Sequence, residues 1–293
     1  MIGAVRAAGL VELLDLERIE HDVFRGRQPQ EQRQRVFGGQ VAGQALVAAG
    51  RTVPAERPVH SLHAYFLRPG DPTLPIVYWV DRIRDGRSFT TRRVVGIQRG
   101  KAIFNLQASF AEHEDGLAHQ EQAPDAPDPD TLPTMEELLR PVGGAAHAWW
   151  SPSNPIDARP VTEPPQLVRA RGGAGHDDVR LWMRTTQPLP DDPLVHVCAA
   201  AFASDMTLLD AVLVRHGLTW DTDLAAGASL DHAMWFHGPF RADEWFLYEQ
   251  HSAWGGSGRG LARGAITTRD GRRVVSVVQE GVLRLKDGRE GNR

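Results

Sequence analysis

A glutamine stands in the middle of an apolar strand pattern near the end of the chain. The stretch VVSVVQEGVLR, residues 274–284, is rich in valine and contains no proline, which predicts a β-strand. Side chains alternate between the two faces of a strand, so Gln279 shares a face with Val275 and Val277. An amide buried there without partners costs about 1–3 kcal/mol. Gln279 is therefore either satisfied by a neighbouring group or takes part in chemistry.

Two further polar residues precede apolar segments of the second half. The stretch DMTLLDAVLVRHG carries apolar residues at helical spacing and predicts a helix that Ser204 or Asp205 caps and Gly217 ends. A carboxylate at the start of a helix is more often a cap than a catalytic base. Ser229, taken alone, is a hydroxyl at the edge of a strand.

Histidines and the single cysteine give weaker signals. His63 and His232 occur in similar contexts, HSLH and DHAMWFH, which suggests a shared structural role such as a buried hydrogen bond. No third ligand accompanies either motif, so we expect no metal site. Cys198 lies in the apolar run HVCAA and is expected to be a buried small side chain rather than a nucleophile.

Composition limits the classes of protein that fit. The 293 residues are 41% hydrophobic, which is enough for a sizeable core. The 33 basic and 37 acidic residues give a net charge of -4, which offers no electrostatic reason to expect nucleic acid. One cysteine excludes an internal disulfide. Acidic residues come too early for a signal peptide, and no apolar run reaches the roughly 18 residues of a membrane helix. We therefore expect a cytoplasmic protein.

The chain divides into two related halves around a proline-rich segment, APDAPDPDTLP. The halves repeat an order of one helix followed by antiparallel strands, and aligning them places Pro69 on Pro239, His63 on His232 and Gln107 on Gln279. A duplicated α+β unit is the physical interpretation. The predicted division is an N-terminal unit over 1–120, a linker with a short helix over 121–153, and a C-terminal unit over 154–293.

Several long motifs resemble one known family, and they occur in the family's order. They are LLDLERIEHDVFRGR, RVFGGQVAGQAL, VHSLHAYFLRPGDP and DGRSFTTRRV in the first half, and FASD, SLDHAMWFH and VVQEGV in the second. The sequence is similar in these motifs to the acyl-CoA thioesterase II family. The resemblance implies a double-hotdog fold, in which each of two fused units wraps an antiparallel sheet around a long helix. It also implies hydrolysis of acyl-CoA thioesters without a metal or cofactor.

The resemblance further implies which residues act. The family's catalytic aspartate, hydroxyl residue and glutamine correspond to Asp205, Ser229 and Gln279. Serine replaces the threonine of many bacterial members, but either hydroxyl can donate and accept a hydrogen bond. In such a site the carboxylate takes a proton from a water that the other two side chains orient. The first half has no acid at the matching helix, so we expect one catalytic set, in the second half.

The substrate contacts and the reaction class leave alternatives open. Arginine suits phosphate geometry, so Arg68, Arg87 and Arg92 are predicted contacts to CoA, and each could equally be a solvated surface charge. His63 is predicted to contribute to the substrate pocket of its half. Medium- to long-chain fatty acyl groups are expected from the resemblance, as is a dimer or tetramer. Two other functions compete: a hotdog hydratase or dehydratase that uses Asp231 and His232, and a non-catalytic acyl-CoA binder.

Overall fold

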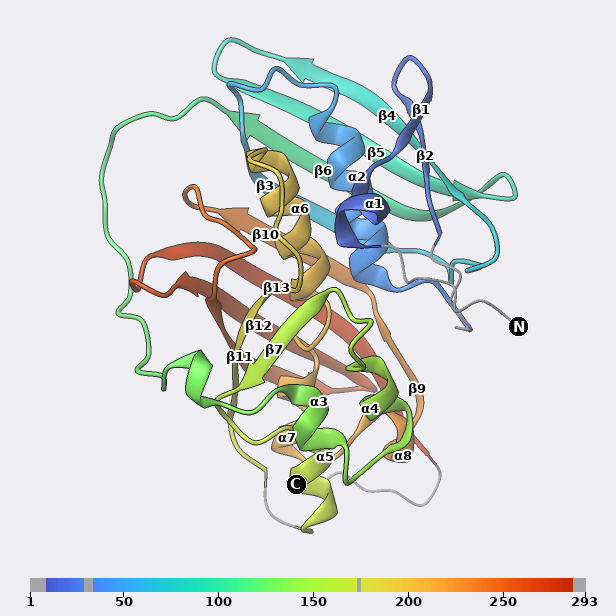
Figure 1. Ribbon diagram of the computed structural model, residues 1–293. Coiled ribbons are helices and arrows are strands. Elements are labelled where there is room, and N and C mark those ends of the chain that lie inside the picture. The colour runs from blue at the N-terminus through green and yellow to red at the C-terminus, as the bar shows by residue number, and fades with distance from the viewer. Residues whose placement is uncertain (1–8, 29–33, 173–174, 287–293) are drawn as a thin grey trace, which may run out of the picture.

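The computed structural model describes residues 9–28, 34–172 and 175–286, in which helices lie against one large antiparallel sheet (Figure 1). The first half contains α1 (Leu10–Leu14), β1 (Glu17–Glu20), β2 (Val23–Gly26), α2 (Gly38–Gly50), β3 (Val59–Phe66), β4 (Ile76–Asp85), β5 (Phe89–Gln98) and β6 (Lys101–Ala111). The connecting segment contains η1 (Pro129–Thr131), α3 (Met135–Leu139) and α4 (Gly144–Trp149). The second half contains β7 (Ile156–Pro160), α5 (Pro165–Ala170), β8 (Asp178–Thr185), α6 (Pro193–Ser204), α7 (Asp210–Arg215), α8 (Trp220–Asp223), β9 (Leu224–Ser229), β10 (Asp231–Phe236), β11 (Phe246–Gly256), β12 (Arg259–Thr268) and β13 (Arg273–Leu285).

The strands of both halves join into one sheet. Their order is β1-β2-β4-β5-β6-β3-β10-β13-β12-β11-β8-β7, and β9 pairs with β13. The halves meet where β3 and β10 run antiparallel, with His63 opposite Ala233 and Leu62 opposite Met234. Each half contributes a central helix and an antiparallel sheet, which confirms the predicted α+β class with two fused hotdog units.

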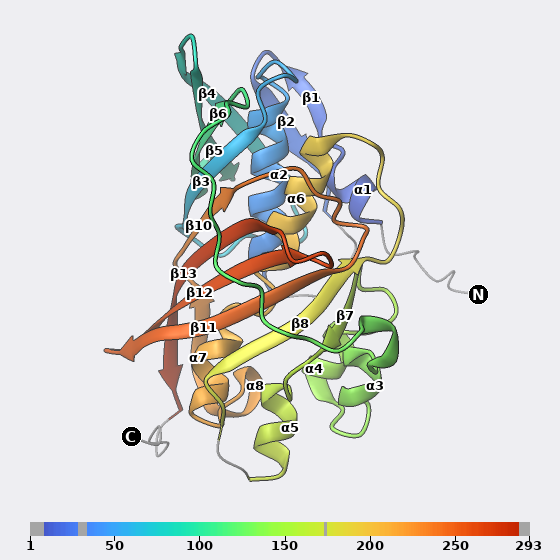
Figure 2. The ribbon, with the colours of Figure 1, turned by 90° about the vertical axis from the view of Figure 1, so that its left-hand side faces the viewer.

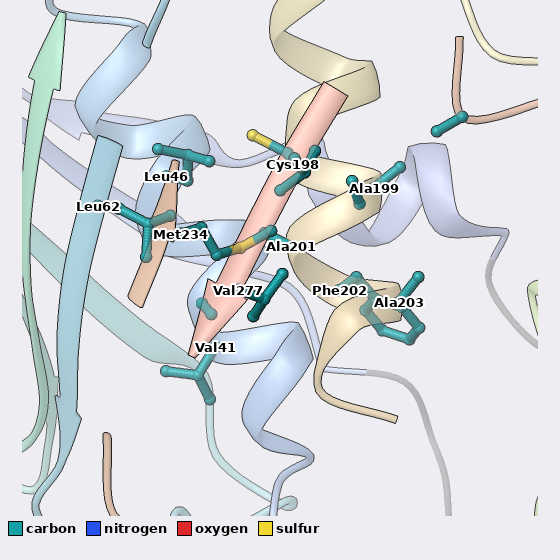
Figure 3. Packing of buried hydrophobic residues seen from close by; sticks show 14 of the residues in the cluster. Val41, Leu46, Leu62, Cys198, Ala199, Ala201, Phe202, Ala203, Met234 and Val277 are labelled. Atoms are coloured by element: carbon teal, nitrogen blue, oxygen red, sulfur yellow. The ribbon is translucent and has the colours of Figure 1, made fainter. Parts of the chain in front are cut away.

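Helices α2 and α6 pack side by side and antiparallel in the centre of the molecule (Figures 1 and 2). A Cβ on Gly39 would come within 2.4 Å of the carbonyl oxygen of Phe202, so only glycine permits this approach. The glycines of α2 therefore allow close contact with the other helix. Figure 3 shows the resulting core, where Leu46 and Cys198 from the helices lie near Leu62 and Met234 from the sheet.

The long helix of the second half lies earlier in the sequence than the apolar stripe predicted. α6 begins at Pro193, with Asp192 accepting a hydrogen bond from the N–H of Leu194, and it ends at Ser204 with Asp205 as its C-cap. The stripe after residue 204 forms only the short helix α7, which is followed by Gly217 at a φ of 63°. The prediction that Asp205 starts a helix was wrong for this helix, because the alanine-rich run before it is the better helix former.

The alignment of the two halves needs a correction of one residue. β3 ends at Phe66 and β10 at Phe236, and this match, which keeps Pro69 on Pro239, places Ala64 on Met234 and His63 on Ala233. His232 is fully buried, whereas His63 is exposed on the outer face with its ring edge-on to Trp235. The shared buried role is therefore wrong for His63, because neighbouring positions on a strand face opposite sides.

The same correction separates the two glutamines. Leu106 faces Ala64 and Val277 faces Met234, so Ala108 and Gln279, each two residues further along, are the matching positions. Gln279 is buried and Gln107 is exposed on the outer face. The pairing of Gln107 with Gln279 was therefore wrong.

Candidate active site

Asp205 gathers the polar groups of the second half at the end of α6. The Ser229 hydroxyl, at the end of β9, donates a hydrogen bond to Asp205 Oδ1 over 3.0 Å. The Gln279 amide, on the inner face of β13, donates to the same oxygen over 2.5 Å. The three residues named from the family resemblance thus lie together, although they are far apart in the sequence. The apolar face around Gln279 is tolerated because its amide N–H has this charged partner.

The first half completes the surroundings of Asp205. The backbone N–H of Gly39, in the first turn of α2, donates to the carboxylate. The N-cap residue of α2, Phe37, has no side-chain cap of its own. Asp205 therefore caps a helix after all, but it is the helix of the other half, where a negative charge also meets the positive end of the dipole. A Cβ on Gly38 would lie 2.6 Å from Asp205 Oδ2, so glycine is needed at this contact.

Burial dominates the electrostatics of the site and raises the pKa of Asp205 to about 6. The hydrogen bonds from Gln279, Ser229 and Gly39, and the charge of Arg35, pull this pKa in the opposite direction. Part of the Asp205 surface remains accessible, but the protein packed around the carboxyl group still displaces most of the water that would solvate its charge. A carboxylate tuned to this range is ionised at neutral pH and basic enough to accept a proton.

A second set of buried groups holds the end of α6 in place, and sequence reasoning missed most of it. The imidazole Nε2 of His232 lies 2.8 Å from the Ser204 hydroxyl, and burial lowers the pKa of His232 to about 4, so the ring is neutral. Tyr248 donates its hydroxyl hydrogen bond to the carbonyl of Ser204 over 3.1 Å. Gln250 donates to Thr207 Oγ1 over 2.8 Å. The strand alternation of DHAMWFH is the only sequence signal for this set, and it indicates a buried His232.

Among the described residues, buried polar atoms without a protein hydrogen-bond partner include Gln250 Oε1, His232 Nδ1 and, next to Asp205, Gln279 Oε1. Gln279 Oε1 is buried and makes no hydrogen bond there, while the amide nitrogen of the same side chain holds Asp205. A side chain that donates to the carboxylate and offers a second polar atom beside it can orient a small polar molecule.

Three of the four predicted substrate contacts do not lie beside Asp205. His63 lies on the outer face of the sheet. Arg87 is exposed in the turn before Phe89. Phe89 pairs with Ala111 at the opposite end of the first half from Gly38, so Arg87 is far from Asp205. Arg92 is 1% exposed and donates hydrogen bonds to Thr52 and Asp85, which favours a structural role.

Of the four predicted contacts, Arg68 alone lies at the end of the sheet that is close to Asp205. It follows β3, whose last residue, Phe66, packs beside Gly38, and its guanidinium donates to the carbonyl of Ala102 over 2.6 Å. It is exposed and its contact with CoA stays a prediction.

The alternative dyad of Asp231 and His232 does not form. These consecutive residues point to opposite faces of β10, and the Asp231 carboxylate accepts the backbone N–H of Glu280 over 2.7 Å while His232 contacts Ser204. Within the described ranges there is no cluster of three or more potential metal ligands, and no described helix is both long and apolar enough to cross a membrane.

The chain is similar to known proteins over most of its length. The family profile described as acyl-CoA thioesterase matches residues 152–282, and the profile of the acyl-CoA thioesterase N-terminal domain matches residues 27–111. Human acyl-coenzyme A thioesterase 8 is 39% identical over 307 aligned residues, which cover 97% of this chain and 91% of that protein.

Solved structures show the same likeness. The acyl-CoA thioesterase II of Mycobacterium marinum has a TM-score of 0.78 at 42% identity, covering 96% of this chain and 99% of the other. A hot dog protein of unknown function from Alicyclobacillus acidocaldarius has a TM-score of 0.75 at 19% identity, covering 94% and 97%, which shows the fold alone. The folded halves, the matched profiles and these relatives together establish that the chain belongs to the acyl-CoA thioesterase II family and is an acyl-CoA thioester hydrolase.

Proposed function

We propose that the protein hydrolyses fatty acyl-CoA to a free fatty acid and CoA, with Asp205 as the general base. The observation that carries this proposal is the convergence of Ser229 and Gln279 on one oxygen of a carboxylate whose pKa burial raises to about 6. The second oxygen of that carboxylate faces Gly38 at the start of α2.

In the proposed mechanism a water attacks the thioester carbonyl carbon directly. Asp205 accepts one proton of the water as the new C–O bond forms, which requires the carboxylate to be ionised. Ser229 and the free Oε1 of Gln279 restrict the orientation of that water, and such positioning can contribute several kcal/mol to the lowering of a barrier. The C–S bond then breaks, and the proton held by Asp205 passes to the departing CoA sulfur. Atoms and charge balance without a metal or a covalent enzyme intermediate.

The beginning of α2 supports the developing negative charge in this scheme. The backbone N–H groups of a helix N-terminus carry partial positive charge that can stabilise an oxyanion. Gly39 already places one such N–H against Asp205, so the start of the same helix is adjacent to the reacting atoms. The first half would thus assist a reaction whose side chains come from the second half.

The finer properties rest on the resemblance. We propose medium- to long-chain acyl groups and self-association as a dimer or tetramer, and, from the sequence composition, a cytoplasmic location. The division into units 1–120 and 154–293 with a linker over 121–153 belongs to the same proposal, and it is supported by the two matched profiles, whose ranges end and begin near the linker.

A panel of acyl-CoA substrates tests the proposal. Saturated acyl-CoAs of increasing length, together with branched, hydroxylated and enoyl derivatives, are followed in parallel for release of free thiol and for change at the Cα–Cβ bond. We expect thiol release with no hydration or dehydration. Hydration without thiol release would instead identify a hydratase, and tight binding without either would identify a carrier.

A further inference from the structure

The register against β13 changes between β9, which ends at Ser229, and β10, which begins at Asp231. Ser229 pairs with Gly281, while Ala233 pairs with Val278. Four steps along one strand therefore face three along the other, which defines a β-bulge at Leu230 and Asp231. Bulges redirect side chains, and this one lies between the catalytic hydroxyl and the buried His232.

The bulge decides which way Ser229 points. If the register of β10 continued unchanged, Gly281 would face Leu230 and Ser229 would face Val282, on the opposite side of the sheet from Gln279. With the extra residue, Ser229 faces Gly281 and shares the inner face with Gln279. His232 also keeps its inner position against Ser204. Without the bulge, Ser229 and His232 could not both point inward, because they are three positions apart and side chains alternate along a strand.

Backbone and side-chain hydrogen bonds hold the bulge from both neighbouring strands. The Leu230 N–H donates to the Glu280 carbonyl over 2.9 Å, but the Leu230 carbonyl turns away and accepts the N–H of Phe66 on β3, also at 2.9 Å. The Glu280 N–H would therefore lack its usual backbone acceptor. The Asp231 carboxylate takes that place at 2.7 Å.

We propose that Asp231 is a positioning residue whose carboxylate replaces the missing backbone acceptor, stabilises the bulge and so directs Ser229 onto Asp205. Asp231 itself makes no contact with Asp205, Ser229 or Gln279 among the hydrogen bonds of the described residues, and its side chain belongs to the other face of the strand. It acts as an acceptor rather than as a charge. The catalytic consequence of this assignment depends on the proposed function, but the structural consequence does not.

Kinetics of four variants test the assignment: D231A, D231N, S229A and the double variant D231A/S229A. Asparagine retains an oxygen that can accept the Glu280 N–H, whereas alanine removes the acceptor. We expect D231A to lower kcat about 10- to 100-fold with little change in KM. This is the effect of losing the hydrogen bond from the Ser229 hydroxyl to the charged Asp205 carboxylate. D231N should stay within about threefold of the unaltered protein. In the S229A background, D231A should cost little more, because the hydroxyl that it positions is already absent.

Crystal structures of D231A and D231N supply a readout that does not depend on catalysis. We expect the Ser229 hydroxyl to leave Asp205 in D231A and to stay within hydrogen-bond distance in D231N. An unchanged contact in D231A would overturn the assignment, as would equal losses of kcat in D231A and D231N or losses that multiply between D231A and S229A. If the unaltered protein released no CoA from any acyl-CoA, the proposed function would fail, and the structures would still decide the role of Asp231.

Discussion

The two halves of the molecule place a large polar side chain on different strands at matching positions of the sheet. In the second half Gln279 on β13 faces Ala262 on β12. In the first half the matching pair is Ala108 on β6 and Arg92 on β5. The small residue and the large one have changed places between neighbouring strands. The two side chains therefore reach the inner face from different strands.

The helix ends show why this exchange matters. Thr52 follows α2 as Ser204 ends α6, and each hydroxyl donates to the carbonyl three residues earlier, over 2.8 and 3.1 Å respectively. The next residue is Val53 in the first half and Asp205 in the second. The Arg92 guanidinium donates hydrogen bonds to the hydroxyl oxygen of Thr52 over 2.9 Å and to the carbonyl oxygen of Thr52 over 3.2 Å.

Two halves with similar folds thus use the matching buried position differently. In the first half a buried arginine uses its donors on protein acceptors, so the position contributes to packing. In the second half a glutamine donates to a buried carboxylate and keeps one acceptor free. A buried group that is fully paired favours stability, whereas one that is incompletely paired is available for function.

Removing the carboxylate should produce the largest effect. Asp205→Asn removes the base but keeps an oxygen that can accept from Gly39, so kcat should fall about 10²–10⁴-fold without loss of folding. The measurement is single-turnover hydrolysis together with urea unfolding. Nearly full activity in this variant would show that Asp205 is not the general base. The difference between Val53 and Asp205 at the matching helix ends would then not explain a single site in the second half.

Gln279→Ala tests the glutamine against its exposed counterpart in the sequence alignment. Because Gln279 donates to Asp205 from a buried position, its loss should lower kcat about 10- to 100-fold and also reduce the free energy of unfolding. Gln107→Ala is the matched control, because that side chain is exposed on the outer face and should change neither quantity. Equal loss of single-turnover rate in both variants would contradict the one-site assignment.

Arg92→Ala tests the first half alone. It leaves a cavity and removes the donors to the hydroxyl and carbonyl oxygens of Thr52, so the free energy of unfolding should fall by about 3 kcal/mol. The turnover of the protein that remains folded should be close to unaltered, because Arg92 lies at the opposite end of its unit from Asp205. Denaturant unfolding and kcat per folded molecule are the two measurements. A fall in kcat or a rise in KM at unchanged stability would instead return Arg92 to the predicted contacts with CoA.

The pH dependence should give a smaller but diagnostic effect. With a pKa of about 6, Asp205 is protonated at lower pH, so kcat should rise about tenfold per pH unit below this value and level off above it. Stability has the opposite sign, because the folded state holds this proton more tightly than the unfolded state, whose carboxyl pKa is near 3.8. The contribution of Asp205 to stability is therefore full below about pH 4 and is lost as the pH rises through about 6. Subtracting the free energy of unfolding of Asp205→Asn at each pH isolates the contribution of this carboxyl group. A difference in the free energy of unfolding that is constant between pH 4 and 7 would contradict the raised pKa.

Patterns along the chain were enough to predict the fold class and to name candidate site residues. The valine-rich alternation around Gln279 placed this amide on a buried face. The cost of burying an amide without a partner then raised the question of which group it binds. The order of the motifs pointed to two hotdog units and to Asp205, Ser229 and Gln279. These features are local patterns or matches along the chain, so they survive without knowledge of what lies across a strand or a helix.

How these residues meet depends on contacts between parts of the chain that are distant in sequence. Asp205 ends α6 and caps α2, a contact between halves that no local helix signal contains. The faces of His63 and Gln107 follow from strand register, where a shift of one residue exchanges inside and outside. The bulge at Leu230 and Asp231 changes that register between Ser229 and His232, and it depends on hydrogen bonds from two other strands. Pairing across strands fixes these positions, because the alternation within one strand leaves its alignment to its neighbours open.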